Sequence, residues 1–146
     1  MSARRDNPRV SAKTKAPLRG CAVLSTDAEL RAALAESFDR PLVLLKHSVW
    51  CGLSMRAIEA AHSEIDNWAV RIGCRVVVVQ DHRDISDANA RRLGIHHETP
   101  KILLIRNGRV MWHASRAEIT DTAVRGALEV AVAQASATKV QSGASR

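Results

Sequence analysis

The pattern of apolar and polar positions divides the chain into alternating strands and helices. Continuous apolar runs are typical of strands buried on both faces of a sheet, whereas apolar residues that recur every three or four positions are typical of helices. Strands are predicted at 21–25, 41–48 and 74–81 and as a pair within 101–114, and helices at 26–39, 51–72, 84–94 and from Thr120 onward. The predicted element order is therefore β-α-β-α-β-α-β-β-α.

Local sequence signals support this order. Thr26 is followed three positions later by Glu29, which is the spacing of a capping box at a helix N-terminus. Gly94 is a typical helix stop, and Asn107-Gly108 is a favoured tight turn between antiparallel strands. Strand-helix-strand crossovers are right-handed and join parallel strands. We therefore expect a thioredoxin-like α/β protein with a central mixed sheet flanked by helices, although other α/β sheets share parts of this order.

The excess of basic over acidic residues lies at the two ends of the chain. Of the 22 Lys and Arg and 15 Asp and Glu residues, 1–20 hold six basic and one acidic, and 134–146 hold two basic and none acidic. The remaining body is neutral, although the whole chain of 146 residues has a net charge of +7. We expect a disordered basic tail at 1–20, one domain at 21–134 and a flexible tail at 135–146.

The same features narrow the class of protein. Nucleic acid is not the expected partner, because only the tails are basic. No apolar run reaches the roughly 20 residues of a membrane-spanning helix, and the N-terminus lacks the apolar stretch of a signal peptide. The expectation is a cytoplasmic protein without membrane contact. A binding protein that uses its basic tail on nucleic acid is the least favoured alternative.

Cys51 stands where chemistry collects in an open α/β sheet. It follows the strand at 41–48 and opens the long helix, so it lies beyond the carboxyl end of a strand and at a helix N-terminus. Unpaired amides and the helix dipole favour a thiolate there and lower the pKa of a thiol from about 8.5. The hydroxyl of Ser54 can donate a hydrogen bond to the sulfur, and Lys46 and His47 add possible positive charge. An inert cysteine that fills space is the less favoured alternative.

The other two cysteines stand at the beginnings of strands. Cys21 and Cys74 are therefore expected at the opposite edge of the sheet from Cys51, and a disulfide tolerates a Cα separation of at most about 7 Å. Their strands could be neighbours, so the two could meet, but buried free thiols are expected in a reducing cytoplasm. Because Cys51 has no internal partner, its oxidised sulfur passes to an external thiol, which predicts a mixed disulfide as the intermediate.

Several motifs closely resemble the monothiol bacilliredoxins of the YtxJ type, which are thioredoxin-fold proteins of the bacillithiol system. The motifs are "LLKHSVWCGLS" (44–54), "RDISDANARRLGIHHETPKILLIRNGRVMWHAS" (83–115) and "EIT" (118–120), and the resemblance covers about residues 25–130. It implies a thiol-disulfide oxidoreductase that removes bacillithiol, or a similar small thiol, from S-thiolated proteins, with Cys51 and Ser54 as the catalytic residues. The small thiol is then a co-substrate, and no cofactor or metal is expected.

The resemblance also implies which residues contact the substrate. Thr99-Pro100 matches the loop that holds a cis-proline beside the cysteine in thioredoxin-like proteins. The other residues assigned to substrate binding are His47, Trp50, Gly52, Leu53 and His97. Three residues depart from the family pattern: Gly52 replaces a proline, Lys101 stands where glutamine is common, and Arg116 replaces a histidine. The departure at Gly52 concerns the choice of small thiol more than the exchange reaction itself.

A second family shares most of the redox motif. The segment "CGLS" (51–54) differs at one position from the C-G-F-S of monothiol glutaredoxins, which hold a [2Fe-2S] cluster between two subunits with cysteine and glutathione. The glycine-and-aspartate motif that this family carries after its last strand is replaced here by "WHASRAEIT" (112–120). A cluster-binding protein that uses Cys51 is therefore the alternative hypothesis. The histidines show no metal-ligand spacing, so no further metal site is predicted.

Overall fold

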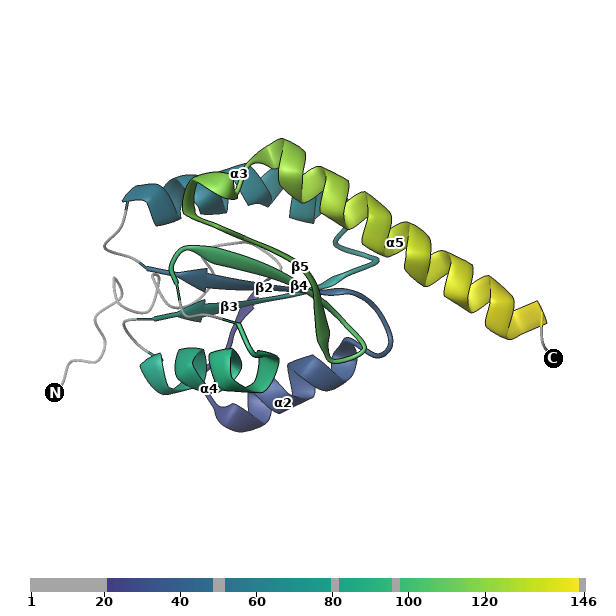
Figure 1. Ribbon diagram of the computed structural model, residues 1–146, viewed down its shortest axis with the longest axis horizontal. Helices are drawn as coiled ribbons and strands as arrows, with labels where there is room; N and C mark the ends of the chain where they lie inside the picture. The colour runs from purple at the N-terminus through teal and green to yellow at the C-terminus, as the bar shows by residue number, and fades with distance from the viewer. Residues whose placement is uncertain (1–20, 49–51, 80–81, 96–97, 145–146) are drawn as a thin grey trace, which may run out of the picture.

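The computed structural model describes residues 21–48, 52–79, 82–95 and 98–144. In these residues, one five-stranded sheet with the strand order β1-β3-β2-β4-β5 is flanked by helices (Figure 1). The strands are β1 (Ala22–Val23), β2 (Leu42–His47), β3 (Gly73–Val78), β4 (Lys101–Arg106) and β5 (Arg109–Ser115). The helices are α2 (Asp27–Glu36), α3 (Gly52–Asn67), α4 (Arg83–Leu93), the short 3-10 helix η1 (Arg116–Glu118) and α5 (Asp121–Ala144). The predicted order is confirmed, and η1 is an addition to it.

The sheet is mixed, as predicted. β1 and β2 both run parallel to β3, whereas β4 runs antiparallel to β2 and β5 antiparallel to β4. Val43 lies opposite Cys74 and His47 lies opposite Val78, so β2 and β3 end at the same edge of the sheet. Figure 1 shows α3 and α4 starting at this edge.

Helices cover both faces of the sheet and create two separate cores. α3 and α5 lie on one face, and α2 and α4 lie on the other (Figure 1). Leu45 of β2 belongs to the core under α3 and α5, whereas Leu44 belongs to the core under α2 and α4. Successive strand residues point to opposite faces. Lys46 therefore faces the α2 and α4 side, and His47 faces the α3 and α5 side.

The helix cap, the helix stop and the tight turn predicted from the sequence are all present. The Thr26 hydroxyl accepts a hydrogen bond from the Glu29 N–H at 3.1 Å, and the Glu29 carboxylate accepts one from the Thr26 N–H at 3.1 Å. Gly94 ends α4 in the left-handed conformation, with φ of 66°. Asn107 and Gly108 have φ of 55° and 75°, and positive φ at both central residues is what the tight turn requires.

Ser37 attaches the tip of the β4–β5 hairpin to the end of α2. Its buried hydroxyl donates to the Leu34 carbonyl at 2.5 Å and accepts from the Gly108 N–H at 2.8 Å. Its carbonyl accepts from the Asn107 N–H and from the Arg106 guanidinium, each at 2.8 Å. The hairpin turn is therefore fixed by both the side chain and the backbone of one serine.

The C-terminal segment differs from its prediction. A flexible tail was predicted at 135–146, but α5 continues to Ala144 and projects beyond the body of the molecule (Figure 1). Residues 135–142 contain neither proline nor glycine, so no helix-breaking residue stands before Gly143, which lies next to the end of α5. The basic tail predicted at 1–20 lies outside the described residues.

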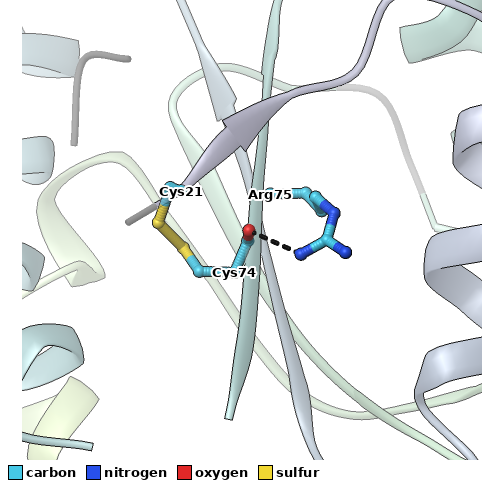
Figure 2. Close-up of a disulfide and its surroundings, with 3 residues drawn as sticks. All are labelled: Cys21, Cys74 and Arg75. Carbon is cyan, nitrogen blue, oxygen red and sulfur yellow. Dashed lines mark hydrogen bonds between the residues drawn. A yellow bond between two sulfur atoms is a disulfide. The ribbon is translucent and has the colours of Figure 1, made fainter. Parts of the chain in front are cut away.

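The expectation of two free thiols away from the redox motif is wrong. Cys21 and Cys74 are joined by a disulfide (Figure 2). β1 and β3 are neighbours, with Ala22 opposite Arg75, and this pairing brings the Cα atoms of the two cysteines to 4.7 Å. The expectation rested on a reducing compartment, whereas strand pairing decides whether two cysteines are within bonding distance.

Candidate active site

The redox motif lies where β2 ends and α3 begins. β2 ends at His47 and α3 starts at Gly52, so Cys51 directly precedes the helix in the sequence. The backbones of Gly52, Leu53 and Ser54 form the first turn of α3. The unpaired N–H groups of a first turn favour an anion at this position. Three predicted site residues, Trp50, Cys51 and His97, lie outside the described residues, so their roles stay predictions.

The Thr99–Pro100 loop lies beside the end of β2. Its peptide bond is cis, as the family resemblance implied. Lys101, the first residue of β4, pairs with Lys46 near the end of β2, which places the loop at the carboxyl edge of the sheet. The Pro100 carbonyl accepts a hydrogen bond from the Arg116 N–H at 3.0 Å. Because Arg116 uses its backbone here, this contact does not depend on the replacement of the family's histidine.

His47 is buried at the end of β2. Only 2% of the residue is exposed, and burial lowers the pKa of the imidazole from its usual 6.5. Burial therefore favours the neutral form of the imidazole. A neutral imidazole offers one N–H donor and one acceptor nitrogen.

Lys46 places a buried charge on the opposite face of β2. The residue is 1% exposed, and its ammonium nitrogen has no hydrogen-bond partner in the part of the chain that the structure describes. Burial, followed by the charge of Lys101, lowers the pKa of Lys46 to about 8. The group is still mainly protonated at pH 7, so it carries a positive charge on the α2 and α4 face of the sheet, at the cost of desolvation.

Lys101 is a second buried lysine at the same edge. It is 2% exposed, and its ammonium group lies 3.4 Å from the Glu98 carboxylate. A hydrogen bond from Ser115, and then the charge of Lys101, hold the pKa of Glu98 below its usual value. Glu98 thus offsets a buried positive charge next to the Thr99–Pro100 loop.

The sequence reasoning missed two polar residues of α4. Ser86 and Asn89 are completely buried, and the side-chain amide of Asn89 has no hydrogen-bond partner among the described residues. The apolar residues Ile85 and Ala88 of the same helix belong to the core under α2 and α4. Residues three apart share a helix face, so Ser86 and Asn89 follow that apolar stripe by one position. This spacing was the signal that could have identified them.

A comparison with family models decides the family. The model described as monothiol bacilliredoxin BrxC matches residues 22–124. The chain belongs to the monothiol bacilliredoxin family. The match begins at β1 and ends in α5, so this bacilliredoxin contains the whole sheet and the Thr99–Pro100 loop within the family region.

Solved structures share the fold of the bacilliredoxin. A protein assigned as an oxidoreductase with a thioredoxin fold matches with a TM-score of 0.64 and 23% identity, over 80% of this chain and 94% of its own. Thioredoxin from Fasciola hepatica matches with a TM-score of 0.62 and 17% identity, over 75% and 97%. Thioredoxin from Trypanosoma brucei brucei matches with a TM-score of 0.57 and 20% identity, over 75% and 88%. These similarities establish the thioredoxin fold.

The family and the fold together support a redox enzyme of the thiol-disulfide oxidoreductase type. Among the described residues, none of the helices combines the length and apolar character needed to cross a bilayer. The same residues contain no group of three or more His, Cys, Asp or Glu side chains placed to hold a metal ion.

Proposed function

We propose that this bacilliredoxin removes bacillithiol, or a similar small thiol, from mixed disulfides on cytoplasmic proteins. The Cys51 thiolate attacks the sulfur of the small thiol, and the substrate protein leaves as a thiolate that takes up a proton. Cys51 then carries the small thiol as a mixed disulfide. A second small-thiol thiolate attacks this disulfide, regenerates the Cys51 thiolate and leaves as the symmetrical small disulfide. The partners are S-thiolated proteins and the small thiol, and no step needs a bound cofactor.

The start of α3 is the observation that carries this proposal. The helix begins at the residue after Cys51, at the carboxyl edge of the sheet and beside the end of β2. The amides of its first turn favour the thiolate over the thiol, and the thiolate is the form that attacks disulfides. The cis Thr99–Pro100 loop lies next to the same strand end.

The disulfide between Cys21 and Cys74 supports a mechanism with one thiol. The chain has three cysteines, and two of them are joined to each other. Both stand at the beginnings of their strands, whereas α3 begins at the carboxyl edge of the sheet, so neither cysteine, bonded or reduced, is placed to close an internal disulfide with the residue before α3. An oxidised Cys51 sulfur must then be released by an external thiol.

The neighbouring residues have distinct roles in the proposal. The neutral imidazole of His47 supplies a hydrogen-bonding group at the end of β2, and the backbone of Thr99 pairs with the substrate chain. Trp50 provides an aromatic platform for that chain. Gly52 and Leu53 present backbone N–H groups at the helix start, and Pro100 and His97 complete the binding surface.

Intact mass measurement tests the proposal directly. The protein is incubated with a bacillithiolated model protein, and the products are analysed without reductant. We expect one bacillithiol on Cys51 and none on the Cys51→Ala variant. Ser54→Ala is the matched variant, which we expect to form the same adduct at a higher apparent thiol pKa. An adduct that appears equally on Cys21 or Cys74 contradicts the proposal, whereas equal transfer from glutathionylated protein contradicts only the preference for bacillithiol.

The cluster-binding alternative rests on the "CGLS" segment, whose last three residues form the first turn of α3. It predicts visible absorbance and a dimer after anaerobic reconstitution with iron, sulfide and a small thiol. A colourless monomer excludes it.

A further inference from the structure

The exchange reaction proposed for Cys51 does not involve the Cys21–Cys74 disulfide. Cys21 directly precedes β1, and Cys74 is the second residue of β3 (Figure 2). The two residues are 2% and 5% exposed. The parallel pairing of Ala22 with Arg75 sets Cys21 opposite Cys74 through the backbone alone. The same strand pairing is therefore compatible with a disulfide and with two thiols.

This pair is separated from the redox motif by the length of β2. Cys74 lies opposite Val43, and four further residues lead to His47 at the carboxyl end of that strand. Four strand residues span about 13 Å at about 3.3 Å each. A disulfide bridges Cα atoms at most about 7 Å apart. α3, which follows Cys51 in the sequence, begins beyond that end of β2, so we infer that this pair does not exchange directly with Cys51 within one folded molecule.

Apart from the disulfide, few contacts hold β1 on the sheet. β1 is an edge strand of two residues, and its pairing with β3 is extended by the Leu24 N–H, which donates to the Val76 carbonyl at 2.9 Å. Strands are usually longer, at about five or six residues. The side chains of Cys21 and Leu24 add apolar contacts in the two cores. A covalent bond at this position is therefore a large part of what holds β1 on the sheet.

We propose that Cys21 and Cys74 form a second thiol-disulfide couple, independent of Cys51, that fastens β1 to β3 when small-thiol disulfides accumulate. One cysteine thiolate attacks the small disulfide and releases one small thiolate. The second cysteine thiolate attacks the resulting mixed disulfide and releases the other. The pair loses two electrons and two protons, and one small disulfide becomes two small thiols.

Burial determines how this couple reacts. Both sulfurs are shielded while β1 is in place, so a small disulfide reaches them only after the strand detaches. The oxidation rate should then level off as the concentration of the small disulfide rises, because detachment becomes limiting. A rate that stays proportional to this concentration contradicts the shielding.

The experiment uses the full chain with Cys51→Ala, so that its outcome does not depend on the proposed exchange function. The protein is equilibrated with glutathione and its disulfide at graded ratios, and free thiols are blocked with N-ethylmaleimide and counted by intact mass. We expect two blocked thiols at reducing ratios and none at oxidising ratios. The 53-residue separation of the pair predicts a melting temperature higher by about 10 °C in the oxidised form.

Serine variants provide the control. Adding Cys21→Ser or Cys74→Ser should give the same lower melting temperature at every ratio. A wild-type pair that keeps two free thiols at every ratio overturns the proposal, and so does a pair that stays bonded at every ratio, because it is then a permanent cross-link. A redox-dependent melting temperature in the serine variants also overturns it, because the effect then arises elsewhere.

Discussion

The Lys46→Met substitution replaces a buried ammonium group with an apolar side chain of similar length. Lys46 is 1% exposed, and its nitrogen has no hydrogen-bond partner among the described residues. Its pKa falls from 10.5 to about 8, first because of burial and then because of the charge of Lys101. At about 1.4 kcal/mol per pKa unit, the protonated group costs the folded state about 3 kcal/mol. The variant should therefore be more stable than the wild type by about this amount at pH 7.

The stability difference between Lys46→Met and the wild type should also change with pH in a definite direction. The unfolded chain binds the proton of Lys46 more tightly than the folded protein does, so the cost is complete below about pH 8. This cost falls as the pH rises from about 8 to 10.5. The folded protein has then released the proton of Lys46, and the unfolded chain gains less and less free energy from keeping its own. The stability difference between Lys46→Met and the wild type should shrink over this range.

Urea unfolding at pH 7, 8, 9 and 10.5, without reductant, measures this difference. Arg109→Met is the control, because Arg109 is exposed, and a substitution of this kind usually changes stability by at most about 0.5 kcal/mol. His47 titrates below pH 6.5 and therefore does not contribute in this range. A Lys46→Met protein that is less stable than the wild type at pH 7, or a difference that does not change with pH, refutes the reasoning.

Two further predictions concern packing and charge. In Gly73→Ala, the added Cβ would lie 2.5 Å from the Glu36 carboxylate and push it away from Arg40 and Arg75, so we expect the free energy of unfolding to fall by about 1 kcal/mol. Gly126→Ala in α5 meets nothing within 4 Å and should gain up to about 1 kcal/mol, and equal effects of the two changes would contradict this. Arg125→Met removes the guanidinium that contacts the buried Glu64 carboxylate at 3.0 and 3.2 Å, so we expect a lower free energy of unfolding than in the wild type. Adding Glu64→Met should recover most of that loss, and a double variant no more stable than the single one would count against an unpaired carboxylate as the cause.

The elements of the fold were predictable because their signals are local. The capping box at Thr26 and the positive-φ turn at Asn107–Gly108 each depend on residues within a few positions. The continuous apolar run of β2 indicated a strand covered on both faces, and the two helical layers provide that cover. The placement of Cys51 before a helix also followed from this order.

The contacts that were not predicted depend on residues far apart in the sequence. Lys46 stands next to the end of an apolar strand, where a lysine often reaches solvent, but it faces the layer of α2 and α4 and lies opposite Lys101 of β4. The Cys21–Cys74 bond required knowing that β1 pairs with β3 rather than with β2. Strand order is a tertiary property, and the apolar pattern of each strand does not contain it.

The attachment of the hairpin turn to Ser37 changes where the chain can be modified. Hairpin turns at the surface are usually among the positions that accept inserted residues. Here the amides of Asn107 and Gly108 are both bound to Ser37, so this turn is a joint between the β4–β5 hairpin and α2. A fluorophore or an affinity tag is better placed at the projecting end of α5, which stands clear of the sheet (Figure 1).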